Sequence, residues 1–315
     1  MSSLPGLTIT PATPAARSRA TAWLAVALGV LIAASYPAVS RIAVTGSLTP
    51  QDLLVLRFGV SGAILLPWLL LHASTVPRAV WRMSVPLSFL QGWGAAACVL
   101  FGLQYTSAAR ASALFQGSVS MWVALVAFVL FRLRPQRAQR VGIGVIAAGT
   151  VLLVSSGSLA AVHPQRWLGD LLMLCAPLLA SGYMIYVQRT RLNPVIGVAL
   201  VAVISALFVI PWALWNGHST LAQAPLAEIA WQVFFQGVLI GCVGMLCLHH
   251  GVLGLGSQAV GAALAMVPVL GLAFSVVVAH ETITLLEGVA AVVVSAGVWL
   301  ATRSARVQVP ITPPS

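Results

Sequence analysis

The sequence predicts an all-α polytopic membrane protein whose ten transmembrane helices form two inverted five-helix repeats. Three observations lead to this prediction: the composition, a series of ten apolar runs and an internal repeat. Of the 315 residues, 60% are hydrophobic and only 7% are charged, too few to cover a water-soluble globule. Backbone polar groups in hydrocarbon must be satisfied internally, which leaves helices or a closed barrel. The alternating strands of a barrel are absent, so helices are expected.

Ten apolar runs are each long enough to cross a bilayer as a helix, which takes roughly 20 residues. Charged residues, prolines and glycines separate the runs. The polar ends 1–20 and 304–315 contain several prolines and are expected to be disordered tails. The expected spans are 21–44, 51–72, 84–104, 108–131, 138–156, 168–188, 195–215, 230–250, 258–279 and 283–302.

All sixteen basic residues are arginines, and their distribution predicts the orientation of the chain. An even number of spans places both termini on one side of the membrane. If that side is the cytoplasm, twelve arginines lie in cytoplasmic segments, and four lie at or near the outer side: Arg41, Arg57, Arg110 and Arg166. Basic residues are enriched in cytoplasmic loops, so we expect cytoplasmic termini and a location in a bacterial inner membrane. The arginines are scattered between apolar runs, so nucleic acid is not an expected partner.

The first half of the chain recurs in the second half. The stretch Gln258 to Glu281 aligns without a gap on Arg110 to Leu133, which places Pro268 opposite Ser120. Five spans per repeat is an odd number, so the second copy, 165–303, must enter the membrane in the opposite direction to the first, 21–157. Other matched motifs keep the same order: Pro50 with Pro67-Trp68 against Pro194 with Pro211-Trp212, and FLQG at Phe89 against FFQG at Phe234.

These features resemble the drug/metabolite transporter superfamily, and within it the EamA-like permeases. The resemblance covers about residues 21–302 and implies a transporter with ten spans in two inverted repeats. Two departures concern the fourth span, which has Ser120 where the family often has proline and is followed by the arginine-rich FRLRPQR instead of a glutamate. The motifs that carry the resemblance are Arg57-Phe58, YTSA from Tyr105, Pro268, HETIT from His280 and the closing SAGVWL.

Polar side chains within apolar spans are costly and tend to face the interior of a helical bundle. Hydrogen bonds between helices are the alternative role for such residues. Pro268 cannot donate a backbone hydrogen bond, so it predicts a bend or an exposed carbonyl at the cavity, with a passive kink as the alternative. The residues predicted to line a substrate cavity are Tyr36, Gln91, Trp93, Gln116, Ser120, Tyr183, Gln236 and Pro268.

Four ionisable residues are candidates for gating or coupling. Arg57 and Arg110 either steer substrate or serve as anchors and structural partners near the interface. Glu287, about one turn into the last span, is the candidate for proton coupling. His250 follows His249 at the inner end of span eight; neighbouring helical residues point about 100° apart, so a shared metal ion is not expected.

The expected function is a secondary transporter, by resemblance an exporter, of a small neutral or zwitterionic metabolite such as an amino acid, working by alternating access. Few acids lie within the spans, which argues against a polycationic substrate. No cofactor or metal is expected, because the four cysteines lack metal-binding spacing and no phosphate-binding loop is present. The alternative is a membrane enzyme or receptor-like scaffold, which would require Glu287, His250 and Arg110 to converge. Proton coupling and the choice between monomer and homodimer stay open.

Overall fold

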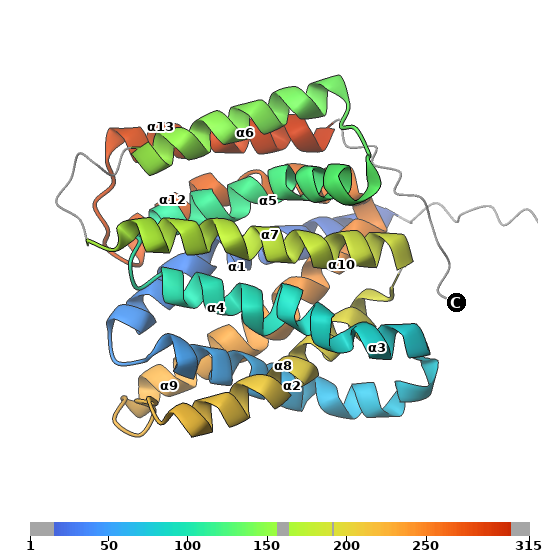
Figure 1. Cartoon of the computed structure of the whole chain (residues 1–315), viewed down its shortest axis with the longest axis vertical. Helices are drawn as coiled ribbons and strands as arrows, with labels where there is room; N and C mark the ends of the chain where they lie inside the picture. Colours follow the sequence, from blue (N-terminus) through green and yellow to red (C-terminus); the bar gives the residue numbers. More distant parts are fainter. Residues whose placement is uncertain (1–15, 156–163, 191, 304–315) are drawn as a thin grey trace, which may run out of the picture.

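The computed structural model describes residues 16–155, 164–190 and 192–303, and the regular structure in these ranges is helical. Ten segments are long and apolar enough to cross a membrane, which confirms the predicted fold class. They run back and forth in one bundle (Figure 1). A short 3-10 helix, η1 (Ala73–Thr75), follows the second span. The ten spans are α1 (Ala16–Thr45), α2 (Pro50–Leu71), α3 (Arg78–Leu87) with η2 (Ser88–Gly92) and α4 (Trp93–Gly102), α5 (Ala108–Phe131), α6 (Arg137–Ser155), α7 (Arg166–Thr190), α8 (Pro194–Asn216), α9 (Leu226–Gln232) with η4 (Val233–Gly244) and α10 (Met245–Leu255), α11 (Ser257–Leu264) with α12 (Val267–Val277), and α13 (Leu285–Arg303).

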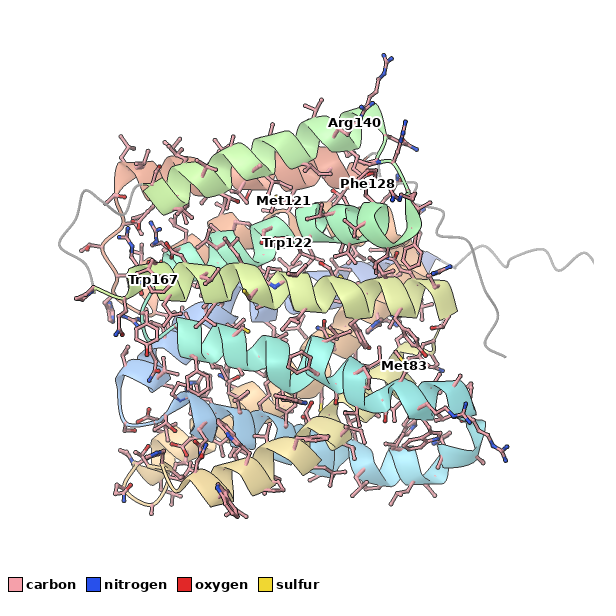
Figure 2. The ribbon with its side chains drawn as sticks, viewed as in Figure 1. Met83, Met121, Trp122, Phe128, Arg140 and Trp167 are labelled. Atoms are coloured by element: carbon pink, nitrogen blue, oxygen red, sulfur yellow. The ribbon has the colours of Figure 1, made fainter. Side chains whose placement is uncertain are left out.

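Both ends of the described chain lie at the same end of the bundle, because the number of spans is even (Figure 1). We call the end where α1 begins and α13 ends the proximal end, and the opposite end the distal end. Arg140 extends away from the bundle near the proximal end, whereas Trp167 lies at the distal end (Figure 2). The two ends therefore differ in the side chains they present.

The first helix begins within the segment that the composition predicted to be disordered. α1 starts at Ala16, although 1–20 was expected to be a tail. The residues from Ala16 to Ala20 include no proline or glycine, and arginine and alanine favour helix, so the helix extends toward the N-terminus. The rest of that tail, 1–15, and the predicted tail 304–315 lie outside the described residues.

The helices of the two halves pack in matching ways. α2 packs against α8, and α6 packs against α13, which pairs the second and the fifth spans of the two halves. α1 packs on α12 and on η4 with α10, as α7 packs on α5 and on α4. α1 runs toward the distal end and α7 toward the proximal end (Figure 1). Each of these contacts in one half thus has a counterpart in the other half. The equivalent helices run in opposite directions.

Glycines allow α6 and α13 to approach closely. A Cβ atom on Gly142 would lie 2.5 Å from the backbone nitrogen of Ala301, and one on Gly297 would lie 2.8 Å from that of Ile146. Membrane helices associate through close van der Waals packing, which small residues permit. Spans five and ten therefore form a tightly packed pair along one edge of the bundle (Figure 1).

Both FxQG motifs lie in π-helical segments. FLQG, Phe89 to Gly92, falls within η2, and FFQG, Phe234 to Gly237, falls within η4. A π turn is wider than an α turn and is frequent at functional sites. The repeated motif thus coincides with a wide turn in spans three and eight, the equivalent spans of the two halves.

Pro268 lies at a break in span nine. α11 ends at Leu264 and α12 begins at Val267, so Pro268 is the second residue of α12. A proline in the first turn of a helix removes no internal hydrogen bond. The equivalent helix of the first half, α5, continues through Ser120 without a break. The two equivalent spans therefore differ at the aligned positions.

Candidate functional site

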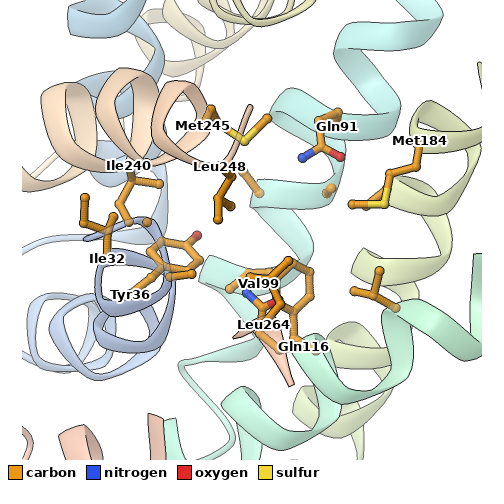
Figure 3. Close-up of a pocket in the computed structure, with 18 of the residues that line it drawn as sticks. Ile32, Tyr36, Gln91, Val99, Gln116, Met184, Ile240, Met245, Leu248 and Leu264 are labelled. Carbon is orange, nitrogen blue, oxygen red and sulfur yellow. The ribbon is translucent and has the colours of Figure 1, made fainter. Parts of the chain in front are cut away.

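A cavity of about 230 Å³ lies between the two halves. Eight of the ten spans contribute to its wall, all except spans five and seven. The cavity begins in the distal half of the bundle, beside Tyr36 and Arg57, and extends to Gly261 and Thr302 near the proximal end. Gln91 and Gln116 approach it from opposite sides, with Tyr36 and Met184 on the two remaining sides (Figure 3). The cavity therefore leads from the middle of the bundle toward the proximal end.

Polar groups are few in the wall of this cavity. Much of the remaining lining is apolar, including Met184, Met245, Leu248 and Leu264 (Figure 3). Pockets for small molecules commonly combine an apolar wall with a small number of polar groups. The sequence-predicted residues that line the cavity are Tyr36, Arg57, Gln91, Gln116 and Ser120.

Arg57 is the charged residue in the wall. Its Nη1 donates a hydrogen bond to the Tyr36 hydroxyl at 3.1 Å, and its guanidinium carbon lies 5.3 Å from the centre of the Tyr36 ring. The Nε of Arg57 is buried and has no hydrogen-bond partner within the described part of the chain. All five acidic residues of the protein are described, and the ion pairs they form do not include Arg57. The cavity therefore contains a positive charge without a carboxylate partner.

Trp93 and Gln236 do not line the cavity. Trp93 packs on the other side of span three, with its ring 6.0 Å from that of Phe208, and borders a separate apolar hollow of about 260 Å³. Gln236 is completely buried, and its Nε2 donates to the Ser40 hydroxyl at 2.8 Å. These two residues were expected in the cavity because they are polar and near mid-span, but their helical phase directs them elsewhere.

Tyr183 and Pro268 also lie outside the cavity wall. Tyr183 is buried and borders a small hollow of about 30 Å³, of which Arg57 and Gln91 also form part. Pro268 is buried at the break in span nine, and the nearby Leu264 lines the cavity in its place. The helix is thus interrupted just before Pro268, and the residue that reaches the cavity precedes it.

A buried ion pair lies at the distal end of the bundle. The Nη2 of Arg110 lies 2.6 Å from Oδ2 of Asp170, and its Nη1 lies 3.7 Å from Oε1 of Glu287. The Arg110 side chain is only 2% exposed. Thr106 donates from its hydroxyl to the Asp170 carboxylate at 2.9 Å. Charges at such depth require partners, and this cluster connects α5, α7 and α13.

Glu281 forms a second contact across the same end. Its carboxylate accepts hydrogen bonds from the backbone N–H groups of Ala108 and Ala109 at 2.8 and 3.1 Å, where α5 begins. The Nε of Arg41 lies 4.0 Å from Glu281. Burial raises the pKa of Glu281 above its ordinary value, although the two N–H groups and Arg41 act against this rise. We call Arg41, Arg110, Asp170, Glu281 and Glu287 the distal seal.

Further hydrogen bonds tie the distal loops of the two halves. Asp52 accepts from the hydroxyl of Ser219 at 2.6 Å and from the backbone N–H of Thr220 at 3.1 Å. Ser47 donates to Glu228 at 2.6 Å. All five acidic residues of the chain thus lie at the distal end, and the two halves are joined there by carboxylates.

The four gating or coupling candidates occupy different places. Arg57 lines the cavity, whereas Arg110 and Glu287 lie together in the distal seal. Glu287 also accepts from the backbone N–H of Thr284 at 3.0 Å, at the start of α13. His250 is exposed at the middle of α10, in the proximal half of span eight. These three described residues, Glu287, His250 and Arg110, therefore do not converge as an enzyme site would require.

Three members of the distal seal were not expected as site residues. Arg41, Asp170 and Glu281 lie far apart in the sequence and meet their partners only in the folded bundle. The signal available in the sequence was the position of the acidic residues, which fall near the predicted outer ends of spans. Which arginine each acid would meet depends on packing between the halves.

Comparisons with known proteins agree with this architecture. Residues 20–155 and 167–303 each match the EamA-like transporter family. A protein described as an uncharacterized transporter from Archaeoglobus fulgidus is 24% identical over 270 residues, covering 81% of this chain and 88% of that protein. A crystal structure of another protein shares the fold, with a TM-score of 0.60 and 16% identity over 93% of this chain and 99% of that chain. The chain belongs to the EamA-like transporter family, within the drug/metabolite transporter superfamily.

Proposed function

We propose that this membrane transporter is a secondary exporter of a small neutral or zwitterionic metabolite, such as an amino acid, and that it works by alternating access. Family membership already makes the chain a transporter rather than an enzyme, and implies a small-molecule substrate. The observation that carries the finer proposal is the contrast between the two ends of the cavity. The cavity extends to Thr302 near the proximal end, while the buried Arg110–Asp170 pair lies at the distal end.

This contrast fits one state of an alternating-access cycle. In inverted-repeat transporters the site lies between the halves, which rock around it. Arg110 belongs to the first half, and Asp170 and Glu287 belong to the second, so opening the distal end requires these contacts to separate. A solute would enter from the proximal side in the described state and leave after the distal seal opens.

The proposed orientation places the proximal end in the cytoplasm of a bacterial cell. The arginine bias supports it, with twelve of sixteen arginines in the segments assigned to that side. All five acids lie at the other end, so the proximal end carries basic charge without acidic charge. With this orientation the cavity faces the cytoplasm, as the first step of export requires.

The size and chemistry of the cavity support a small solute. Its volume of about 230 Å³ is below the roughly 300 Å³ at which pockets for drug-sized molecules begin. The described residues that form its wall include no carboxylate, so a polycation would lose its hydration without gaining a counter-charge. A small solute with an apolar body fits this wall best.

Proton coupling through Glu287 is a further part of the proposal. Glu287 lies in the distal seal, 3.7 Å from Arg110, and its protonation would remove one charge from that contact. Proton binding would then affect the opening of the distal seal rather than the binding of the solute. The proposal applies equally to a monomer and to a homodimer, because the cavity is formed within one chain.

Transport assays with purified protein test the proposal directly. The full-length chain is reconstituted into liposomes, and counterflow of a broad panel of labelled amino acids and related solutes is measured in both gradient directions. We expect at least one solute to exchange well above protein-free liposomes, with heat-inactivated protein as a second control. If no solute in the panel moves faster than in empty vesicles, the proposed substrate class is wrong.

A further inference from the structure

We propose that Arg57 is the residue that recognises substrate in the cavity, and that the transported solute carries a carboxylate that pairs with it. The substrate class would be organic monocarboxylates with an apolar body; apolar amino acids are the zwitterionic members that already lie within the proposed function, and simple monocarboxylates extend it to anions. This inference rests on the proposed transport function and adds a chemical group that the substrate must possess.

The position of Arg57 argues for a ligand. It lies seven residues after Pro50, the first residue of α2, which places its backbone about 10 Å along the helix axis from the distal start. Charged side chains at such positions in membrane proteins commonly mark substrate or ion pathways. The side chain lines both the main cavity and the small hollow beside it. Arg57 is therefore placed to meet a solute inside the bundle.

The unused hydrogen-bonding capacity of Arg57 points to an anion. A guanidinium carries five N–H donors in a fixed planar arrangement. One of them bonds to the Tyr36 hydroxyl, and the buried Nε has no partner within the described ranges. The arginines of the distal seal show the contrast, because Arg41 and Arg110 both have carboxylates within 4.0 Å. Arg57 is therefore available to bind the carboxylate of a solute.

Charge balance favours a monocarboxylate over a phosphate ester. Arg57 supplies one positive charge, and the other polar groups that line the cavity are neutral: Tyr36, Gln91, Gln116, Ser120 and Thr302. A carboxylate carries one negative charge and accepts two parallel hydrogen bonds from a guanidinium. A phosphate monoester near neutral pH carries more negative charge than Arg57 neutralises. The cavity therefore matches a single carboxylate.

The rest of the wall defines the body of the solute. Met184, Met245, Leu248 and Leu264 line the cavity on the proximal side of Arg57 and offer an apolar surface. Methionine side chains adapt to ligands of different shape, so the wall suits both aliphatic and aromatic bodies. The Oε1 atom of Gln91 is buried without a hydrogen-bond partner in the described structure, and it is placed to accept from an ammonium group when the solute is an amino acid.

Binding experiments with matched probes test this inference. The purified full-length chain in detergent is titrated with 3-phenylpropionate, 4-methylpentanoate and L-phenylalanine, and with 3-phenylpropanamide and phenethylamine, which lack the carboxylate. Isothermal calorimetry and tryptophan fluorescence report the affinities. We expect the three carboxylates to bind at least roughly tenfold more tightly than the amide and the amine, because a charged hydrogen-bonded pair is lost without the carboxylate.

Variants separate recognition from folding. Arg57→Gln should bind the carboxylates roughly tenfold or more weakly, whereas Arg57→Lys should keep the preference for carboxylate over amide at reduced affinity. Arg140→Gln removes the same charge at an exposed site (Figure 2) and should bind as the natural chain does. If Arg57→Gln fails to fold, the comparison of 3-phenylpropionate with its amide on the natural chain still tests whether binding requires the carboxylate.

The outcomes distinguish this inference from the proposed function. Equal affinity for 3-phenylpropionate and 3-phenylpropanamide, unchanged carboxylate binding by Arg57→Gln, or no binding of any carboxylate at millimolar concentration would overturn it. If carboxylate-free solutes are nevertheless transported in liposomes, transport stands and only the role of Arg57 fails. If no solute binds and none moves, the proposed function itself fails.

Discussion

The Arg110 guanidinium lies 2.6 Å from the Asp170 carboxylate in an almost fully buried position, and this contact joins the first repeat to the second at the distal end. Removing one partner of a buried pair leaves an uncompensated charge, at a cost of about 3–5 kcal/mol. Asp170→Asn and Arg110→Gln should therefore each lower the melting temperature of the detergent-purified protein. The double variant should be less damaging than the sum of the two. Additive losses would mean that the pair has no energetic coupling.

Access to the cavity should depend on the side from which a reagent arrives. In a chain with its four natural cysteines replaced, Ser120→Cys introduces a thiol in the cavity wall. A membrane-impermeant thiol reagent should label it in inside-out vesicles and much more slowly in right-side-out vesicles, because the distal seal is closed. His218→Cys, exposed in the distal loop, should show the opposite preference. Equal labelling of Ser120→Cys from both sides would contradict a closed distal end.

The distal seal should become more stable at acidic pH. Burial raises the pKa of Glu281, so this carboxyl becomes protonated at a higher pH in the closed seal than an exposed glutamate does. Opening of the distal end would bring Glu281 into water and return its pKa toward the ordinary value, so the closed seal binds the proton more tightly and is favoured by protonation. Labelling of Ser120→Cys from the distal side should thus decrease as pH falls through the raised pKa. In Glu281→Gln, whose side chain is neutral like the protonated acid, the labelling should be slower at neutral pH and lose much of its pH dependence.

Glu287 provides the test of proton coupling. If Glu287 is the coupling site, Glu287→Gln should abolish the dependence of flux on a pH gradient while counterflow continues, because exchange of solute needs no net proton movement. Reconstituted protein with an imposed pH gradient gives the measurement. A variant whose flux still follows the pH gradient would exclude Glu287 as the coupling site.

The packing of α6 on α13 should tolerate no side chain at Gly142. A Cβ atom there would lie 2.5 Å from the backbone nitrogen of Ala301, so Gly142→Ala should push the helices apart and lower the melting temperature. A Cβ atom on Gly144, in the same helix, would meet no neighbouring helix of the described structure within 4 Å. Gly144→Ala is therefore the matched control and should be neutral or slightly stabilising, because alanine favours helix more than glycine does. Similar melting temperatures for the two variants would contradict the close contact.

The ten spans and the repeat were predictable because apolar length and motif order are properties of the linear chain. The positions of cavity residues were only partly predictable. Gln91 and Trp93 are two residues apart, so their side chains point about 200° apart on a helix and do not share one wall. Gln91 lines the cavity, and Trp93 faces Phe208. Polarity alone located the right span without determining the direction of each side chain.

Contacts between the halves were the least predictable feature. Gln236 is the repeat partner of Gln91, but it donates to Ser40 in α1 and is buried. Glu287 has the depth expected of a coupling residue, yet its proximity to Arg110 depends on how α13 packs on α5. Such pairings combine residues far apart in the sequence, and no local pattern encodes them.

We expect the two π-helical segments to let the cavity change shape through rotation of the helices that follow them. η2 covers five residues and η4 covers twelve, although both contain the same motif. Conversion of a π turn to an α turn changes the register by one residue, which rotates the following helix by about 100°. In span eight this rotation would carry Met245 and Leu248 out of the cavity wall while the span keeps its place in the bundle. Disulfide crosslinking from cysteines at these two positions would detect it, since their neighbours would change together.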